Sequence, residues 1–233
     1  MKDLFGHALL EYQNGKYSED IETSSSLDEH DVMPLPYLFR GYGDMPSIEK
    51  KALQHCKGRI LDIGCGAGSH CIYLQRKGFE VIALDSSKGA IETCGLRGIK
   101  NRIHTDILDF NQGKFDTLLM LMNGIGIVGK LENLGRYLEH LKTLLRPDGQ
   151  ILLDSSDIIY MFDDADDGRT YVANSDRYYG EVEFSLRYKN HKGAAFSWLY
   201  VDYRTLRSIA ETCGIRCEIV EKGEHYDYLA RLW

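Results

Sequence analysis

The sequence predicts an α/β protein with a doubly wound, mostly parallel sheet of seven strands, the last of them antiparallel. Helical stretches separate five short apolar runs, at residues 59–63, 80–84, 102–104, 115–122 and 150–154. This alternation is typical of a parallel sheet that helices cover on both faces. Two more β-like runs, at residues 216–221 and 226–233, end the chain and predict an antiparallel pair around Lys222-Gly223-Glu224.

The intervening helices are predicted from apolar spacing and from residues that end a helix. Within residues 131–145, one face carries five leucines at three- and four-residue steps: Leu131, Leu134, Leu138, Leu141 and Leu145. The turn Arg146-Pro147-Asp148-Gly149 then precedes the fifth strand. Further helices are expected at residues 47–56, 69–77, 87–97 and 204–212, and Gly78 and Gly214 end two of them.

Residues 1–45 are predicted to form an amino-terminal cap or lid segment, and residues 46–233 the main domain. Residues 4–12 keep helical apolar spacing, whereas the acidic, serine-rich residues 18–31 are expected to form a loop. The aromatic stretch around Tyr37, Arg40 and Tyr42 lies between prolines and is expected either to fold over a bound ligand as a lid or simply to pack within the amino-terminal segment.

A β-hairpin is predicted as an insertion at about residues 178–203. Its strands are residues 181–189 and 196–203, joined by Asn190-His191-Lys192-Gly193. Aromatic side chains concentrate here and have three possible uses, as a substrate pocket, as a subunit interface or as core covering the sheet: Tyr178, Tyr179, Phe184, Tyr188, Phe196, Trp198, Tyr200 and Tyr203.

Bulk properties exclude several classes of protein. The formal net charge of -7 argues against a nucleic-acid partner and favours a small molecule or a protein. No apolar run approaches the roughly 18 residues of a membrane span. The six cysteines lack paired CxxC spacing, which favours free thiols in a reducing cytoplasm. We therefore expect a cytoplasmic monomer or homodimer without a membrane partner.

No metal site is expected. His7, His70 and His104 are isolated in the sequence. The acidic run Asp163-Asp164-Ala165-Asp166-Asp167-Gly168 resembles a calcium loop only superficially, because it lacks the glutamate at the twelfth position, and it is expected to be a solvated loop.

The loop after the first strand of the sheet, Asp62-Ile63-Gly64-Cys65-Gly66-Ala67-Gly68, has glycine at every second position. It lies at the carboxyl end of a strand and the amino end of a helix, where open α/β sheets bind nucleotides. A dinucleotide fold asks for Gly-x-Gly-x-x-Gly, but here the third glycine comes one position early, and Ser69 occupies the expected place.

This loop resembles the glycine-rich signature of class I S-adenosylmethionine-dependent methyltransferases. The resemblance covers residues 58–155, because four further segments follow in the family's order: Leu84-Asp85-Ser86, Thr105-Asp106-Ile107, Phe115 to Gly126, and Leu144 to Leu153. It implies that S-adenosylmethionine is the cofactor and S-adenosylhomocysteine the product. It also implies a set of cofactor contacts: Asp62, Gly64, Cys65, Gly66, Gly68, Asp85, Ser86, Asp106, Ile107, Met122, Asn123 and, from the amino-terminal segment, Arg40.

The resemblance gives these residues separate roles. Asp85 would accept both ribose hydroxyls, and Asp106 would accept from the adenine amine while Ile107 covers the ring. The simpler alternatives are that Asp85 caps the helix at residues 87–97 and that Asp106 is a loop residue beside a core isoleucine. Arg40 would pair with the methionyl carboxylate, or else it packs within the amino-terminal segment.

The expected reaction is methyl transfer to an oxygen, nitrogen or carbon of a small molecule. The enzyme mainly has to align the acceptor, and it needs a base only if the acceptor arrives protonated. No catalytic residue is assigned; Asp154 and Asp157 either orient the acceptor or terminate the fifth strand. The segment at Asn123 lacks the Asn-Pro-Pro-Tyr pattern of amino-methylating nucleic-acid and glutamine enzymes, and no cysteine follows a proline as in cytosine-C5 enzymes.

Two alternative functions remain at this point. One is a regulatory protein that binds S-adenosylmethionine or S-adenosylhomocysteine without turnover, and the other is an NAD-dependent oxidoreductase.

Overall fold

A seven-stranded sheet forms the centre of the molecule, in the order β11-β12-β7-β6-β3-β4-β5. The computed structural model describes residues 3–162 and 177–233, so the acidic run at residues 163–168 lies outside the described residues. The parallel strands are β3 (Arg59–Ile63), β4 (Glu80–Asp85), β5 (Asn101–His104), β6 (Phe115–Met120) and β7 (Leu145–Ser156). The last strand, β12 (Asp227–Leu232), is antiparallel to both β7 and β11 (Cys217–Lys222), which confirms the predicted sheet.

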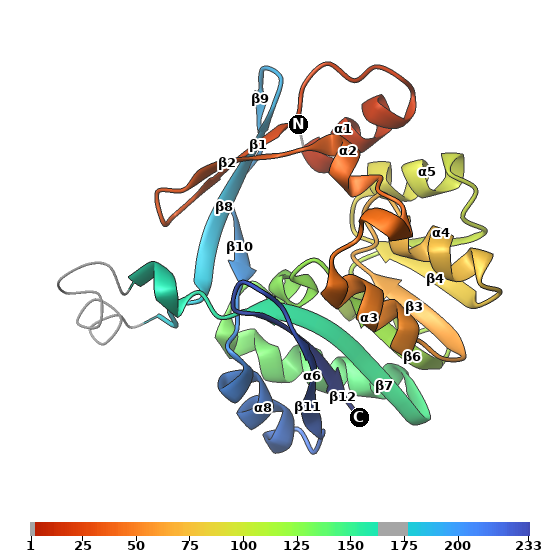
Figure 1. Cartoon of the computed structure of the whole chain (residues 1–233), viewed down its shortest axis with the longest axis vertical. Coiled ribbons are helices and arrows are strands. Elements are labelled where there is room, and N and C mark those ends of the chain that lie inside the picture. The colour runs from red at the N-terminus through yellow and green to blue at the C-terminus, as the bar shows by residue number, and fades with distance from the viewer. Residues whose placement is uncertain (1–2, 163–176) are drawn as a thin grey trace.

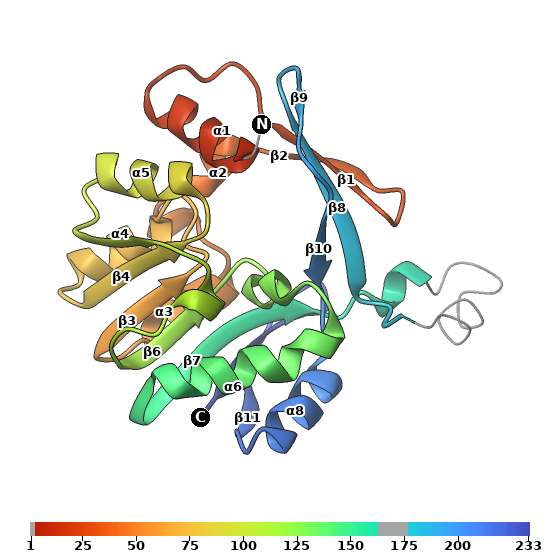
Figure 2. The same ribbon diagram turned by 180° about the vertical axis from the view of Figure 1, so that it is seen from behind.

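Helices cover both faces of this sheet because successive strand residues point to opposite sides. Ile60 belongs to one core, shared with α3 (Ser47–His55), α4 (Ser69–Arg76) and α5 (Lys88–Leu96). Leu61 belongs to the other, shared with α6 (Leu134–Leu144) and α8 (Tyr203–Thr212). The two layers appear in turn at the front of the opposite views (Figure 1) and (Figure 2).

A second, antiparallel sheet lies beyond the carboxyl edge of the first (Figure 1). The predicted hairpin forms its centre, with β8 (Glu181–Tyr188) paired to β10 (Phe196–Leu199) and to the short β9 (His191–Lys192). The amino-terminal segment adds β1 (Ile21–Ser25) and β2 (His30–Met33), with Thr23 opposite Leu186. The sheet therefore joins two segments about 160 residues apart in the sequence.

The prediction of a loop at residues 18–31 is wrong. Ile21 is fully buried and anchors the segment, whereas the next residue, Glu22, faces outward and pairs with Arg187. Pairing with β8 therefore overrides a local composition that resembles a loop.

Helix α1 (Leu4–Gln13) packs closely on α5 through two glycines. A Cβ atom added to Gly89 would lie 2.4 Å from the carbonyl carbon of Gly6. Asp3 caps α1 by accepting from Gly6 N at 3.0 Å, and it also accepts from Gly89 N at 2.9 Å and from Ser87 Oγ at 2.8 Å. The start of the chain is thus tied to the amino end of α5, beside the end of β4.

The connections contain α2 (Leu35–Leu38) and five short 3-10 turns, η1 (Tyr42–Asp44), η2 (Ile107–Asp109), η3 (Gly124–Val128), η4 (Leu131–Asn133) and η5 (Ile159–Phe162). The predicted strand at residues 115–122 ends at Met120, because Met122 and Asn123 have left-handed φ angles. In the described parts of the chain, every helix is too short or too polar to cross a membrane.

Candidate active site

The glycine-rich loop has open space on one side and close packing on the other. Gly64, Gly66 and Gly68 all have positive φ, of 71°, 53° and 80°, which glycine adopts without strain. A Cβ atom on Gly68 would lie 2.2 Å from Ile99 Cδ1, whereas one on Gly64 would meet nothing within 4 Å. Near Gly66 the closest atoms belong to Phe5, at 3.9 Å. Gly68 is therefore required by packing, while Gly64 and Gly66 leave room for a ligand.

Asp85 lies beside this loop at the end of β4 and is buried. Its carboxylate accepts from Gly66 N at 2.9 Å and from Ser87 N at 2.8 Å. Burial raises the pKa of this carboxyl group, and the two backbone amides act against that rise. The cap of α5 is Ser87, whose Oγ accepts from Ala90 N, so Asp85 does not cap the helix. Since a carboxylate has about four acceptor positions, Asp85 has capacity for a further ligand.

The other predicted contacts on this side lie at the ends of β4 and β5. Ser86 is exposed, and its carbonyl oxygen lies 3.0 Å from His104 Nε2. Asp106 is also exposed and accepts from Leu108 N at 2.8 Å, while Ile107 is buried in the core. These contacts match the simpler alternative for Asp106 and Ile107, and their contact with adenine stays a prediction.

Two consecutive residues after β6 have a strained backbone. Met122 and Asn123 have φ angles of 66° and 53°, a region that costs energy for residues with a Cβ atom. Asn123 Nδ2 donates to the Leu199 carbonyl oxygen at 3.2 Å, but its buried Oδ1 has no hydrogen-bond partner among the described residues. A strained turn with a spare acceptor is typical of a binding site.

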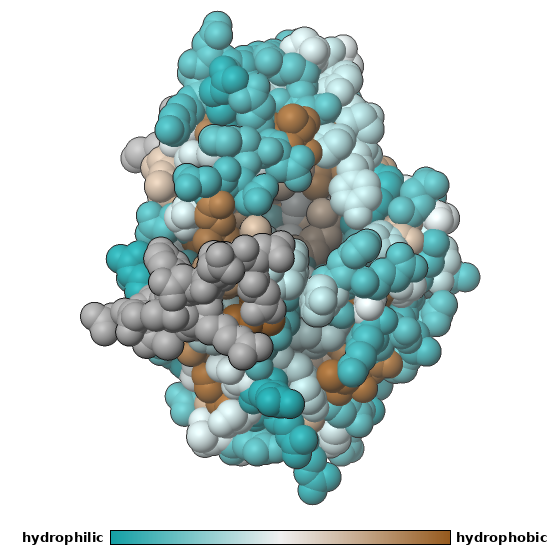
Figure 3. All heavy atoms as spheres, turned by 60° about the vertical axis from the view of Figure 1, so that its left-hand side comes forward, coloured by the Kyte–Doolittle hydropathy of each residue, from teal (hydrophilic) through white to brown (hydrophobic). Residues whose placement is uncertain are grey.

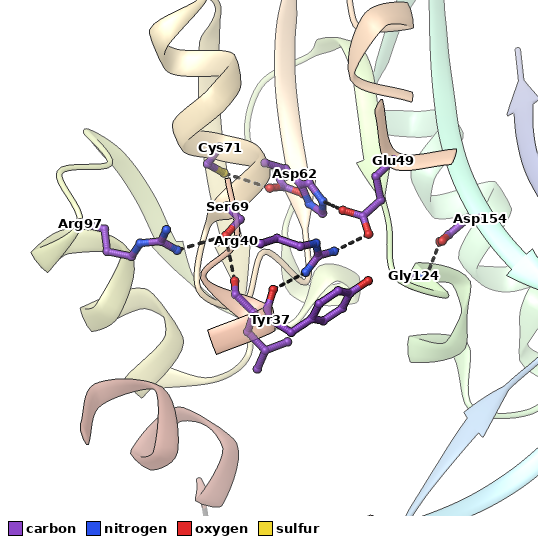
Figure 4. A network of polar contacts seen from close by, with 11 residues as sticks. Tyr37, Arg40, Glu49, Asp62, Ser69, Cys71, Arg97, Gly124 and Asp154 are labelled. Carbon is purple, nitrogen blue, oxygen red and sulfur yellow. Dashed lines mark hydrogen bonds and ion pairs between the residues drawn. The ribbon is translucent and has the colours of Figure 1, made fainter. Parts of the chain in front are cut away.

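A buried chain of charged groups links the amino-terminal segment to α3 and α4 (Figure 4). Glu49 forms an ion pair with Arg40 and accepts from His70, whose Nε2 lies 2.8 Å from Glu49 Oε2. Burial alone would raise the pKa of Glu49, but His70 and Arg40 outweigh it and lower the pKa. Burial likewise opposes the charged form of His70, and Glu49 and Asp62 outweigh it, so the pKa of His70 is raised.

Arg40 is therefore engaged within the protein, as the packing alternative expects. Its Nη1 donates to the Tyr37 carbonyl oxygen at 2.6 Å, and its guanidinium lies 3.9 Å from the centre of the Tyr37 ring. Its pairing with a cofactor carboxylate remains a prediction. Glu49 was not identified from the sequence. The available signal was an acidic residue on the apolar face of a helix, at three- and four-residue steps from Ala52 and Leu53.

Two further predicted residues lie beneath the loop. Asp62 is 2% exposed, accepts from the Cys71 thiol at 3.0 Å, and has a pKa that burial raises. Cys65 Sγ lies 3.8 Å from Cys94 Sγ, and this contact together with burial raises the pKa of the Cys65 thiol. A thiol that keeps its proton is a poor nucleophile, so Cys65 is not expected to act as one.

Asp154 lies in β7 at the same edge of the sheet as Asn123. Its Oδ1 accepts from Gly124 N at 3.0 Å, and burial raises its pKa to about 6. The Tyr37 side chain is 41% exposed, and its hydroxyl points toward the side where Asp154 and Gly124 lie (Figure 4). Asp157 instead accepts from the Tyr179 hydroxyl at 2.7 Å and from Ile159 N, so it stabilises the chain after β7.

An aromatic face of the second sheet lies opposite this edge. Phe184 and Phe196 are directly paired across β8 and β10, and Trp198 lies on the same face. This face is directed toward η3, because a Cβ atom on Gly126 would lie 2.0 Å from Trp198 Nε1. The space-filling view shows a hollow in the molecular surface with apolar side chains around it (Figure 3). No group of three or more potential metal ligands occurs in residues 3–162 and 177–233.

The chain is similar to known proteins over most of its length. The family model described as "Methyltransferase domain" matches residues 42–213. An S-adenosylmethionine-dependent methyltransferase from Bacteroides fragilis, solved in complex with S-adenosylhomocysteine, is 42% identical with a TM-score of 0.91, over 100% of this chain and 94% of that one.

Curated relatives match over a shorter region. The ubiquinone biosynthesis O-methyltransferases of Rickettsia typhi and Bradyrhizobium diazoefficiens are 28% and 30% identical over 46% and 43% of this chain. The chain spans less than half the length of these two relatives, 46% and 42%. The family model that matches residues 42–213 covers the glycine-rich loop, Asp85 and the strained turn at Asn123. The chain therefore belongs to the methyltransferase domain family.

Proposed function

We propose that this protein transfers a methyl group from S-adenosylmethionine to a small-molecule acceptor. The observation that supports this most is the loop at residues 64–68, where Gly64 and Gly66 leave open space next to the buried carboxylate of Asp85. The residues present fit the cofactor, since Asp85, Asp106 and the spare Oδ1 of Asn123 supply acceptors for its hydroxyl and amino groups. When bound, S-adenosylmethionine supplies an electrophilic methyl group.

The acceptor would bind between the two sheets. Phe184, Phe196 and Trp198 would contact its apolar part and exclude water. Asp154 would accept a proton from its nucleophilic group, because Gly124 N holds this carboxylate in place at the edge of the main sheet. A proton acceptor is useful for a hydroxyl, so we propose an oxygen nucleophile first, in line with the O-methyltransferases named among the relatives.

Calorimetry separates this function from an oxidoreductase, and an assay for methylated product separates it from a regulatory protein. S-adenosylhomocysteine is titrated into the protein alone and into the protein saturated with NAD. Methyl transfer requires binding of S-adenosylhomocysteine that NAD does not weaken. Binding of NAD alone would support an oxidoreductase and contradict the proposal. Binding of S-adenosylhomocysteine without any methylated product would support the regulatory alternative.

A further inference from the structure

A second pocket lies on the outer side of α4, under the amino-terminal segment. Its volume is about 420 Å³, within the range of small-molecule sites, which is roughly 300–1,000 Å³. One wall is the segment from Phe39 to Tyr42, and another is α4, through Ile72, Tyr73 and Arg76. The rings of Tyr42 and Tyr73 stack at 4.2 Å and hold these two walls together.

Positive charge gathers in this pocket without acidic residues. Arg40, Arg76 and Arg97 all line it, and none of the described lining residues is acidic. Arg40 is neutralised by Glu49, but its buried Nε has no hydrogen-bond partner in the part of the chain that the structure describes. Arg76 is exposed at the end of α4, and within residues 3–162 and 177–233 no ion pair involves it.

Among the described residues, Arg97 has only neutral hydrogen-bond partners. Its Nη1 donates to the Ala67 carbonyl oxygen at 2.5 Å and to Ser69 Oγ at 3.3 Å, and its Nη2 to the Phe39 carbonyl oxygen at 3.3 Å. Its guanidinium points toward Ser69 (Figure 4). Burial lowers the pKa of Arg97, and so does the like charge of Arg76. The pocket thus holds two arginines that repel each other and lack a counter-charge from any described residue.

This pocket is separate from the space proposed for the cofactor. Gly64, Gly66, Asp85 and Asn123 do not line it, and Tyr73 and Arg76 belong to the second half of α4, away from the loop. The two sites are connected through Arg97, which donates to the Ala67 carbonyl oxygen of the loop, and through Arg40, which lines the pocket and is also a predicted cofactor contact.

We propose that this pocket binds a phosphorylated small molecule, with Arg76 and Arg97 as its charged contacts. Two guanidinium groups match the charge of a phosphate dianion, and their forked donors match its oxygens. A bound phosphate would remove the repulsion between the two arginines. The rest of such a molecule would fit in the remaining volume of the pocket, where Gln13 and the stacked Tyr42 and Tyr73 supply polar groups.

Calorimetric titration with inorganic pyrophosphate tests this site, at an ionic strength kept constant with sodium chloride. We expect one pyrophosphate per chain. Arg76→Gln should weaken binding about tenfold, as expected for a lost charge-assisted hydrogen bond. Arg136→Gln is the matched control, because Arg136 is an exposed arginine on α6, which covers the other face of the sheet. Arg97→Gln should weaken binding further, and a thermal melt checks that this variant is folded.

The same titration is repeated with the protein saturated with S-adenosylhomocysteine. Pyrophosphate binding should persist, because the two sites are separate. The proposal is overturned if the wild-type protein binds no pyrophosphate, if Arg76→Gln binds as tightly as Arg136→Gln, or if S-adenosylhomocysteine displaces pyrophosphate.

Discussion

Three aspartates near the carboxyl edge of the main sheet, the buried Asp62 and Asp85 and the half-buried Asp154, have different hydrogen-bond donors. Asp62 accepts from a thiol beneath the loop, Asp85 accepts from two backbone amides of the loop and of the next turn, and Asp154 accepts from Gly124 N. Of the three, Asp154 is in the strand that faces the strained turn, and its pKa of about 6 places its ionisation near physiological pH. The protonation of Asp154 can therefore be followed through the pH dependence of activity and of stability.

Asp154→Asn should remove a pH dependence of activity. Asp154 accepts a proton only when ionised, so kcat/KM of the wild type should rise with pH through about 6 and then level off. Burial is the main cause that raises this pKa, the amides of Gly124 and Asn123 act to lower it, and Glu49 and His70 make smaller contributions of opposite sign. The variant should lose about a hundredfold in kcat/KM and the rising limb with it. A variant that kept the rising limb would show that another group titrates.

The pH dependence of the free energy of unfolding gives an independent check on the raised pKa of Asp154. Because the folded pKa of about 6 lies above the ordinary value of 3.8, the folded state holds the proton more tightly. The free energy of unfolding should therefore fall as pH rises from about 4 to about 6, and Asp154→Asn should flatten this decline. Chemical unfolding at several pH values measures it.

At the residue scale, the sequence allowed the loop glycines and Asp85 to be selected as cofactor contacts, and it left Asp154 as one of two candidates beside the acceptor, because each lies at the end of a predicted strand. It did not indicate Glu49 or the pairing of Arg40 with it. That contact joins a short helix before the sheet to a segment without periodic pattern, so no local spacing predicts it.

At the element scale, the glycines of the loop between β3 and α4 have different roles: Gly68 is required for packing, and Gly64 leaves space for a ligand. Gly64→Ala meets no neighbouring atom, so it should cost only the strain of a left-handed alanine, roughly 1 kcal/mol. The added methyl group nevertheless enters the space proposed for the cofactor. We expect S-adenosylhomocysteine affinity to fall at least tenfold while the protein stays folded.

Two matched variants serve as controls for Gly64→Ala, one for backbone strain and one for packing. Gly78→Ala has the same kind of strain, with φ of 90° and open space, but lies at the far end of α4, so cofactor affinity should not change. Gly68→Ala should unfold more easily than either, because its methyl group meets Ile99. If Gly64→Ala binds S-adenosylhomocysteine as well as Gly78→Ala does, the loop is not the cofactor site.

The elements of the main sheet were predictable because their apolar runs and helical periods are local. The order of elements, the antiparallel end and the hairpin all follow from patterns within about 20 residues. Strand β1 was not predictable in this way, since its partner β8 is far away in the sequence and Ile21 is its only strong apolar signal. The end of β6 was placed two residues late because the left-handed Met122 and Asn123 follow an unbroken apolar run.

At the scale of the whole molecule, the second sheet lies opposite the carboxyl edge of the first, with a hollow in the molecular surface (Figure 3). Its outer face is polar, with the ion pair of Glu22 and Arg187, and its inner face is aromatic. Although the net charge of the chain is -7, three arginines gather in the pocket on the outer side of α4. The aromatic residues of the hairpin were apparent in the sequence, but the arginine cluster was not, because it depends on the amino-terminal segment packing beside α4 and Arg97.

Phe196→Ala tests whether the inner face binds the acceptor. Phe196 is 38% exposed, so the variant should fold, and it should raise the KM for the acceptor severalfold without changing S-adenosylhomocysteine affinity. Val32→Ala is the matched control, since Val32 is 49% exposed and lies opposite Glu22, on the outer face of the same sheet. Equal KM values for the two variants would place the acceptor elsewhere.

The proposed reaction is methyl transfer to a small molecule at the carboxyl edge of the main sheet. The most direct measurement incubates the protein with methyl-labelled S-adenosylmethionine and a metabolite extract, followed by mass spectrometry. We expect label in a small molecule. We also expect labelling to decrease strongly for Asp85→Ala but not for Glu139→Ala, because Glu139 is an exposed residue on α6. Label in no metabolite, with S-adenosylhomocysteine bound tightly, or equal labelling by the two variants would contradict it.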